Sequence, residues 1–519
     1  MGGSGRASGP PPEQSFEFFG PYIGPVGIVF GTPLLCYALY GLCGPHGCLD
    51  LSAFRVPGLP TSTPLFTWTA LGVVLGWVAF QAALHILLPG KLVKGVVLRN
   101  GETLTYKLNG LYNFWITMAL VLVLSFATQT VDLGWVYDNY VPLLTASLVL
   151  SVSLSVLLYV GSHLPWRRGR VLTAKAADTG YWLYDFYMGR ELNPRLGSFD
   201  LKQWCELVPG LLGWLVLDLG MAHRQWQRDG QFSAAMLLVC AFQGLYVWDS
   251  VQHEPAILTS MDITTDGFGF MLSFGDLTWV PFTYSTQARC LVARAPRLSG
   301  LAVAALVLLK GLSYAAFRGS NSQKDAFRRD PGAPAVKHLR SMPTERGTRL
   351  LISGWWGISR HPNYLGDWLM AWAWCLPTGL SSGVIPYFYV IYFGVLLVHR
   401  ALRDDHACRE KYGKDWDKYC KAMVRPPDDA MLAFLLGTAI GVMMLLSVVE
   451  MWVHNAMEHG WLSITLSAAA GALFFRLAHP LLNKLTGDTE GAGAHAAPAA
   501  AAELVPATRP ARERQGGAG

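Results

Sequence analysis

Residues 353–367 read SGWWGISRHPNYLGD, and this stretch decides how the rest of the chain is interpreted. An apolar hairpin follows it, after which residues 399–405 read HRALRDD and residues 411–420 read KYGKDWDKYC. Polar, aromatic and charged groups therefore stand immediately before and after a run that is apolar enough to enter a bilayer. Because such groups are costly at membrane depth unless they line a site, the stretch predicts a functional site carried by a membrane protein.

The composition agrees with a membrane protein that has many spans. The 519 residues are 52% hydrophobic and only 15% charged, with a mean hydropathy of +0.30, whereas a soluble domain carries about 25% charged residues. The net charge of +6 is modest. No basic stripe interleaved with aromatic residues stands outside the loops, so we expect no nucleic-acid partner.

The hydropathy pattern predicts an all-α fold, a polytopic transmembrane helical bundle of about ten spans with an extra C-terminal helical hairpin. The predicted core spans lie at residues 22–43, 64–88, 111–133, 141–162, 205–222, 232–250, 267–286, 299–317, 364–380 and 384–399. The seventh of these carries Asp276, and Pro377 breaks the ninth. Two further spans are predicted at 430–452 and 461–482.

The same pattern divides the chain into four parts. Residues 1–19 are expected to form a disordered N-terminal lead, and residues 484–519 a disordered tail rich in Ala and Gly. Between them lie the membrane domain that carries the site, at 20–425, and the extra transmembrane hairpin, at 426–483.

The distribution of Lys and Arg among the loops predicts the orientation. The loops after the second, fourth and eighth spans are rich in these residues, whereas the loop at 134–140 has none. Counting alternate sides places every basic loop and residues 400–425 on one face, which should be the cytosolic face. Arg289, Arg294 and Arg297 fall on the other face and are exceptions.

Two cations mark the end of the eighth predicted span. Lys324 and Arg328 are four residues apart, so a helix would place them on one face. On a cytosolic face they would suit a polyanionic cofactor, because Arg binds phosphate in a bidentate way. Ordinary positive-inside charge without a ligand is the alternative, and the spacing alone favours it.

Aromatic and polar side chains cluster more specifically in the opening stretch. Trp355 and Trp356 could stack on a flat ring, while His361 and Asn363 offer hydrogen bonds to amide or ribose groups. An interfacial aromatic belt is the alternative. The presence of His, Asn, Arg and Asp within the same short stretch favours a binding site over that alternative.

A second cluster follows the apolar hairpin. Arg400 and Asp404 are four residues apart and could pair on a helix. Tyr412, Trp416 and Tyr419 recur at helical spacing and would make a flat aromatic face. These groups form either the second wall of a nucleotide pocket or a juxtamembrane helix with surface ion pairs.

Polar side chains also interrupt the sixth predicted span. Tyr246, Trp248 and Asp249 should face the bundle interior, where a buried phenol or carboxyl could deliver a proton. Helix–helix hydrogen bonding is an equally good interpretation. The sequence has no G-x-G-x-x-G after a strand-like run, no Walker A pattern and no zinc-spaced cluster, so a dinucleotide would be held without a Rossmann fold, and no metal is predicted.

These motifs make the chain resemble the membrane Δ14-sterol reductase family, which includes the reductase domain of the lamin B receptor. The resemblance runs from about residue 16 to residue 420 and rests on YDFYMGRELNPR at 184–195, MDITTDGFGF at 261–270 and the 353–420 stretch. Related Δ7-sterol reductases share much of this pattern. The Gly-Trp-Trp-Gly and His-Pro-Asn forms resemble the Δ14 branch more closely.

The resemblance implies a ten-helix bundle with NADPH in a cytosol-facing pocket and a sterol substrate that enters an adjoining cavity from the bilayer, among membrane lipids. It also implies a multi-pass protein of the endoplasmic reticulum membrane, which is continuous with the nuclear envelope, and it defines no oligomeric state. The residues that match cofactor-binding positions are Lys324, Arg328, Trp356, His361, Asn363, Asp367, Arg400, Asp404 and Tyr419. Tyr246 and Asp404 match the catalytic positions for proton delivery.

The implied reaction follows from the chemistry of an isolated alkene, which is a poor hydride acceptor. Protonation of the C14=C15 bond at C15 leaves positive charge on tertiary C14, and hydride from NADPH then adds to C14. Tyr246 is assigned the donor role, with Asp404 as an alternative donor or relay.

The chain departs from the family pattern at the end of the pocket. The family closes with Val-Pro-Tyr-Arg after the Tyr-Cys pair, whereas here Tyr419 and Cys420 run into Lys421 and then two extra apolar spans. Arg425 could substitute for the missing Arg, but the Tyr is absent.

Three other interpretations are open. One is reduction of the sterol Δ7 bond with the same cofactor. Another is membrane methyl transfer, since isoprenylcysteine methyltransferases carry a similar Arg-His-Pro-x-Tyr, but these enzymes have far fewer spans and lack the motifs at 185–195 and 262–267. The third is a non-catalytic nuclear-envelope scaffold that binds sterol, like the lamin B receptor, which would need a sizeable basic domain before the first span.

Overall fold

The structure is a computed structural model of the chain, and it describes residues 20–44, 47–48, 64–165, 172–379 and 383–423. The chain divides into two compact units, residues 1–451 and 452–519, and all of the described residues belong to the first. The predicted N-terminal lead, the extra hairpin and the tail lie outside the described residues.

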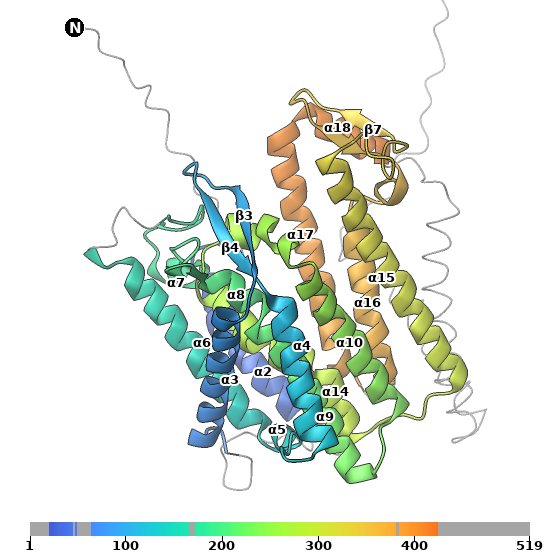
Figure 1. Cartoon of the computed structure of the whole chain (residues 1–519). Coiled ribbons are helices and arrows are strands. Elements are labelled where there is room, and N and C mark those ends of the chain that lie inside the picture. Colours follow the sequence, from blue (N-terminus) through green and yellow to red (C-terminus); the bar gives the residue numbers. More distant parts are fainter. Residues whose placement is uncertain (1–19, 45–46, 49–63, 166–171, 380–382, 424–519) are drawn as a thin grey trace, which may run out of the picture. The chain divides into compact units, whose positions relative to one another are not determined.

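Helices dominate the described part of the first unit, which confirms the prediction of an all-α polytopic membrane protein (Figure 1). Within that part, eight helical stretches are long and apolar enough to cross a membrane. They consist of α1, η1 and α2 (Ile23–Val26, Gly27–Gly31, Thr32–Gly41), α3 (Trp68–Leu87), α4 and η3 (Gly110–Val121, Leu122–Ala127), α6 (Tyr140–Ser162), α8 and α9 (Leu201–Leu207, Pro209–Asp229), α10 (Ala234–Gln252), α15 (Gly300–Arg329), and η10 with α17 (Ile385–Tyr387, Phe388–Tyr412). Exposed apolar side chains such as Leu87, Leu157 and Val395 cover their outer faces, as contact with lipid requires.

Two of the predicted spans are interrupted. The seventh is divided into α12 (Phe270–Phe274), the π-helical turn η6 (Gly275–Trp279), α13 (Val280–Tyr284) and α14 (Thr286–Ala293). The ninth is the shorter helix α16 (Pro362–Cys375), followed by η8 (Leu376–Thr378). Pro281 and Pro377 stand in these segments, and proline disturbs an α-helix because it lacks an N–H and clashes with the preceding turn.

Helices α15 and α16 pack closely because Gly366 faces α15. A Cβ atom added at Gly366 would lie 2.6 Å from the backbone nitrogen of Phe317 and 2.9 Å from the carbonyl oxygen of Ser313. Helices α10 and α17 flank this pair (Figure 1), and a core that includes buried Trp374 and Tyr389 fills the space between them. These four helices are the scaffold of the candidate site.

Short strands and helices connect the long helices. The antiparallel hairpins are β1–β2 (Cys43–Gly44, Gly47–Cys48), β3–β4 (Lys91–Val97, Thr103–Leu108), β5–β6 (Arg195–Leu196, Phe199–Asp200) and β7–β8 (Ser341–Pro343, Arg349–Leu351). The short helices are α5 (Trp135–Asp138), α7 (Trp182–Met188), η5 (Glu254–Thr259), α11 (Met261–Thr264), η7 (Gly354–Gly357) and α18 (Lys414–Met423). Strand β7 and helix α18 lie over the ends of α15 and α17 (Figure 1).

The buried Lys202 holds the motif MDITTDGFGF, at residues 261–270, beside α17. The Lys202 ammonium in α8 is fully buried and donates to the backbone carbonyl oxygens of Asp262 and, at 2.8 Å, Asp266. The carboxylates of the same two residues reach α17, where Asp262 lies 3.9 Å from Arg400 Nη2 and Asp266 lies 3.5 Å from Arg403 Nη2. The motif therefore links α8 to the helix that carries Arg400 and Asp404 of the predicted site.

Candidate functional site

The innermost part of the site is a partly buried phenol beside a buried carboxyl. Tyr246 on α10 and Asp367 on α16 share a side-chain hydrogen bond. The Tyr246 ring contacts two indoles, with centroid distances of 6.1 Å to Trp214 and 5.5 Å to Trp374. Asp367 is buried, and its Oδ1 has no hydrogen-bond partner among the described residues. The phenol and the carboxyl thus lie in an aromatic part of the bundle.

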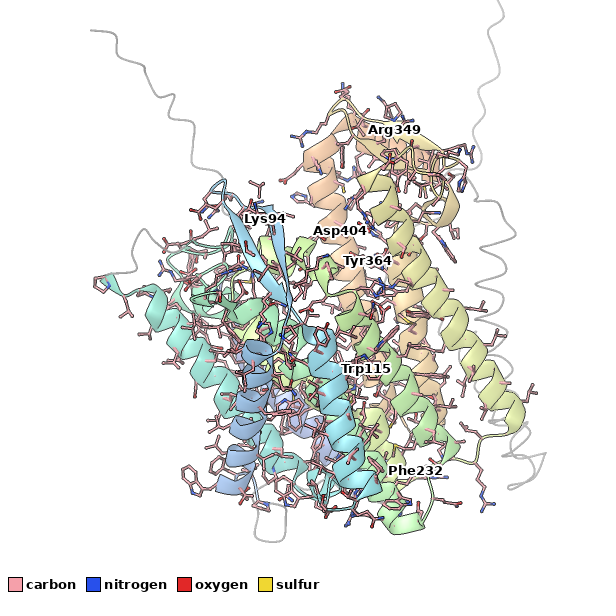
Figure 2. The ribbon with its side chains drawn as sticks, in the orientation of Figure 1. Lys94, Trp115, Phe232, Arg349, Tyr364 and Asp404 are labelled. Carbon is pink, nitrogen blue, oxygen red and sulfur yellow. The ribbon has the colours of Figure 1, made fainter. Side chains whose placement is uncertain are left out.

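A second group lies nearer the predicted cytosolic end, between α16 and α17. The Tyr364 hydroxyl donates a 2.6 Å hydrogen bond to Asp404 Oδ2, and both residues are labelled in Figure 2. Arg400, one turn before Asp404, also hydrogen-bonds to Tyr364. The His361 ring stacks on the Tyr364 ring with a centroid distance of 4.8 Å and an interplanar angle of 3°. Burial lowers the pKa of His361, so its imidazole is neutral at neutral pH.

A third group is formed by the last turns of α15 and the segment before α16. The Lys324 ammonium lies 4.3 Å from the centre of the Trp356 ring, and Trp356 Nε1 donates a 2.9 Å bond to the carbonyl oxygen of Ser320. Asn363 Nδ2 donates to Asn321 Oδ1 at 3.3 Å. The two residues of each of these contacts are more than thirty residues apart in the sequence, and they meet because the segment before α16 and the start of α16 pack against α15.

Helix α18 closes this end of the described chain. Tyr419 is buried and stacks on Trp416 with a centroid distance of 4.9 Å, and burial raises the pKa of Tyr419 to about 12. Trp416 Nε1 donates to Asp405 Oδ1 at 2.9 Å, and the Arg360 guanidinium lies 2.9 Å from the same oxygen. These bonds attach α18 to α17 and to the segment that precedes α16.

Most of the predicted site residues therefore meet at one end of the α10–α15–α16–α17 scaffold. Arg328 is exposed in the last turn of α15, near enough to Lys324 for their charges to interact. The Trp355 indole packs on α15, because a Cβ atom added at Gly319 would lie 2.7 Å from Trp355 Nε1.

Two polar groups were not among the predicted site residues. Arg318 of α15 forms an ion pair with Asp249 of α10, and Tyr314 donates to the same carboxylate at 2.8 Å. Lys310 is buried deeper in α15, and Asp367 is its acidic neighbour. A lone lysine inside the apolar run of α15 was the available sequence signal, but its neighbours depend on how α15 is rotated against α10 and α16.

Comparison with known proteins shows that most of the chain matches a known protein family. Residues 13–425 match the profile of a family described as the ergosterol biosynthesis ERG4/ERG24 family. The Delta(14)-sterol reductase erg24 of Schizosaccharomyces pombe is 45% identical over 410 residues, which cover 79% of this chain and 95% of that protein. The Delta(14)-sterol reductase of Ascobolus immersus is 42% identical over 425 residues, with 79% and 97% covered.

The match to a similar protein from an animal covers a smaller share of that protein. The Delta(14)-sterol reductase LBR of Gallus gallus is 44% identical over 405 residues, which are 78% of this chain and 62% of that protein. The region that matches the family profile, residues 13–425, contains all of the candidate site residues.

Proposed function

We propose that this chain, which belongs to the ergosterol biosynthesis ERG4/ERG24 family, reduces the C14=C15 double bond of a sterol intermediate with NADPH. The observation that carries the proposal is the arrangement of the site: cations and rings on α15, α16 and α17 adjoin the hydrogen-bonded pair of a phenol and a carboxyl, Tyr246 and Asp367. The names of the similar proteins support the choice of the Δ14 bond.

The residues of the outer part of the site fit NADPH. Lys324 and Arg328 would hold its phosphates, and Arg400 would add a third cation. The buried atoms Asn363 Oδ1 and Ser359 Oγ have no hydrogen-bond partner among the described residues, which is expected of groups that await the hydroxyls or amide of a ligand. When bound, NADPH supplies a hydride to C14.

The inner part of the site supplies the proton. Tyr246 would donate its hydroxyl proton to C15, and the hydrogen bond to Asp367 holds the phenol in place. Asp404, bound to Tyr364, is the alternative donor or relay. The indoles of Trp214 and Trp374 beside Tyr246 keep water away from the positive charge that develops at C14.

The surroundings of the protein follow from the substrate. A sterol partitions into the bilayer, so we propose that it reaches Tyr246 from the membrane, with lipids as the neighbours of the exposed apolar helix faces. We place the protein in the endoplasmic reticulum membrane and the continuous nuclear envelope.

Complementation tests the proposed reaction. Yeast lacking Δ14-reductase activity should lose its accumulated Δ14 sterols when this chain is expressed, as sterol profiling by mass spectrometry would show. Persistence of Δ14 sterols, with the protein present in the membrane fraction, would contradict the proposal. Loss of Δ7 sterols in a Δ7-reductase mutant, without rescue of the Δ14 mutant, would identify the other bond.

A further inference from the structure

Lys310 occupies an unusual position for a cationic side chain. It lies within the membrane-spanning part of α15 and is only 2% exposed. A lysine at this depth is costly, and such residues generally face the bundle interior and mark functional sites. The direction in which its ammonium points therefore indicates what it does.

Three aromatic rings surround the Lys310 ammonium. The distance from Nζ to the ring centre is 4.7 Å for Trp374, 5.9 Å for Tyr246 and 5.9 Å for Phe242. Aromatic faces attract a cation, especially where water is excluded. Among the described residues, Nζ has no hydrogen-bond acceptor. The rings thus surround the Lys310 amine beside the Tyr246 phenol.

Asp367 connects this cation to the phenol. Its carboxyl interacts electrostatically with Lys310 and hydrogen-bonds to Tyr246, while its Oδ1 is buried without a partner. The other cations whose charges act on Tyr246 are Arg400 and Arg318, but Arg318 is engaged by the Asp249 carboxylate, and Arg400 by Tyr364 and Asp262. Lys310 is therefore better placed than Arg318 to respond to charge that appears on Tyr246.

We propose that Lys310 is a positioning residue for proton delivery, an inference that rests on the proposed function. When the O–H bond of Tyr246 breaks and a C–H bond forms at C15, the electron pair stays on the phenol oxygen. The Lys310 charge stabilises that phenolate, which makes the phenol a stronger acid. A proton taken from water restores the phenol through Asp367 and completes the cycle.

The size of the effect follows from the distance. The Lys310 Nζ lies 5.9 Å from the centre of the Tyr246 ring. Two unit charges about 6 Å apart in a partly polarisable protein interior interact strongly enough to change a rate by about 100-fold. Removal of the cation should therefore slow the proton-transfer step by about 10- to 100-fold and should leave NADPH binding unchanged, because the cofactor cations lie further along α15.

Two variants of the full-length protein, purified into lipid nanodiscs, test the inference. Lys310→Met retains the side-chain volume without the charge, and Lys310→Ala leaves room for a small amine. Single-turnover reduction of a Δ14 sterol at saturating NADPH should slow in both, with the NADPH Kd within twofold of wild type. Proton transfer should limit the rate more strongly, so the solvent isotope effect in D₂O should rise. Methylamine should restore part of the Lys310→Ala rate.

Leu306→Ala is the matched control. Leu306 is also fully buried on α15, so this change creates a cavity but retains the cation, and methylamine should not alter its rate. A wild-type rate in Lys310→Met would overturn the role of Lys310. So would a slow Lys310→Ala variant whose isotope effect is unchanged and that no amine restores. A wild-type protein that does not reduce the sterol at all would overturn the proposed function, and this inference with it.

Discussion

The phenol of Tyr246 is the residue on which the proposed chemistry depends most directly. Tyr246→Phe should retain the ring contacts with Trp214 and Trp374 but remove the proton, so turnover should fall by about 100-fold or more. NADPH affinity should not change, which isothermal titration would show. Tyr187→Phe is the control, because this tyrosine is fully buried and its hydroxyl contacts Met271, in another part of the core. Unchanged turnover in Tyr246→Phe would remove this residue from the mechanism.

Lys324 should act on binding instead of chemistry. Its ammonium lies against the Trp356 ring in the last turns of α15, where it would meet a phosphate. Lys324→Met should raise the KM for NADPH by about tenfold, which corresponds to about 1.4 kcal/mol, with little change in kcat. The exposed lysine Lys337 provides a control, since Lys337→Met should leave both constants unchanged. A fall in kcat alone would contradict a role in phosphate binding.

Residue type and local spacing were sufficient to predict many of these positions. His361, Asn363 and Asp367 stand in one short stretch that can form a single helix start, so their proximity follows from the sequence itself. The ion pair of Arg318 with Asp249 and the aromatic surroundings of Lys310 could not be predicted, because they depend on how α15 is rotated against α10. Hydropathy also could not predict the π-helical turn that, with Pro281, divides the seventh span.

At the scale of elements, the contact between α15 and α16 is sensitive to a single methyl group. Gly366→Ala would place a Cβ atom 2.6 Å from the α15 backbone, and the two helices would have to separate. Overpacking of this kind costs about 1–3 kcal/mol, so the apparent Tm should fall and NADPH should bind more weakly. Gly311→Ala on α15 meets open space and should leave the Tm unchanged or slightly raised. Equal Tm values for the two variants would contradict the close packing.

Glu254 joins three elements and should make stability depend on pH. Its carboxylate accepts bonds from the Gly110 backbone N–H at 2.9 Å and from Gln203 Nε2 at 3.0 Å, yet burial raises its pKa to about 7. The folded protein therefore holds a proton that the unfolded chain releases above about pH 4.5. This contribution is complete below that pH and is lost as the pH rises through about 7.

The measurement compares wild type with Glu254→Gln, which cannot titrate. Between about pH 5 and pH 8 the free energy of unfolding of the wild type should fall by roughly 2–3 kcal/mol relative to that of the variant. The apparent Tm of the wild type should therefore fall relative to that of Glu254→Gln as the pH rises. The Glu102→Gln variant, at an exposed carboxylate of the β3–β4 turn, should follow the wild-type pH profile. A wild type whose stability rises over this range relative to Glu254→Gln would show that the folded state favours the carboxylate.

At the scale of the whole described unit, the predicted orientation can be tested directly. Lys94 and Arg349 lie at one end of the bundle and Phe232 at the other (Figure 2). If the first end faces the cytosol, an N-glycosylation acceptor inserted after Gly230 should be glycosylated in microsomes, and one inserted after Arg346 should not. Endoglycosidase sensitivity on a gel reads out both. Glycosylation of only the acceptor inserted after Arg346 would show that the protein has the opposite orientation.

Two successive indoles of the segment before α16 contact the same turn of α15. Trp355 packs over Gly319, and Trp356 Nε1 donates a hydrogen bond to the Ser320 carbonyl oxygen. These two contacts make α15, η7 and the start of α16 a single rigid unit. A molecule as large as a dinucleotide must then enter between this unit and the outer part of α17 with α18. The core around Trp374 and Tyr389 joins α16 to α17 deeper in the bundle, whereas the outermost contacts include the half-exposed ion pair of Arg360 with Asp405. Entry and release should accordingly quicken with ionic strength.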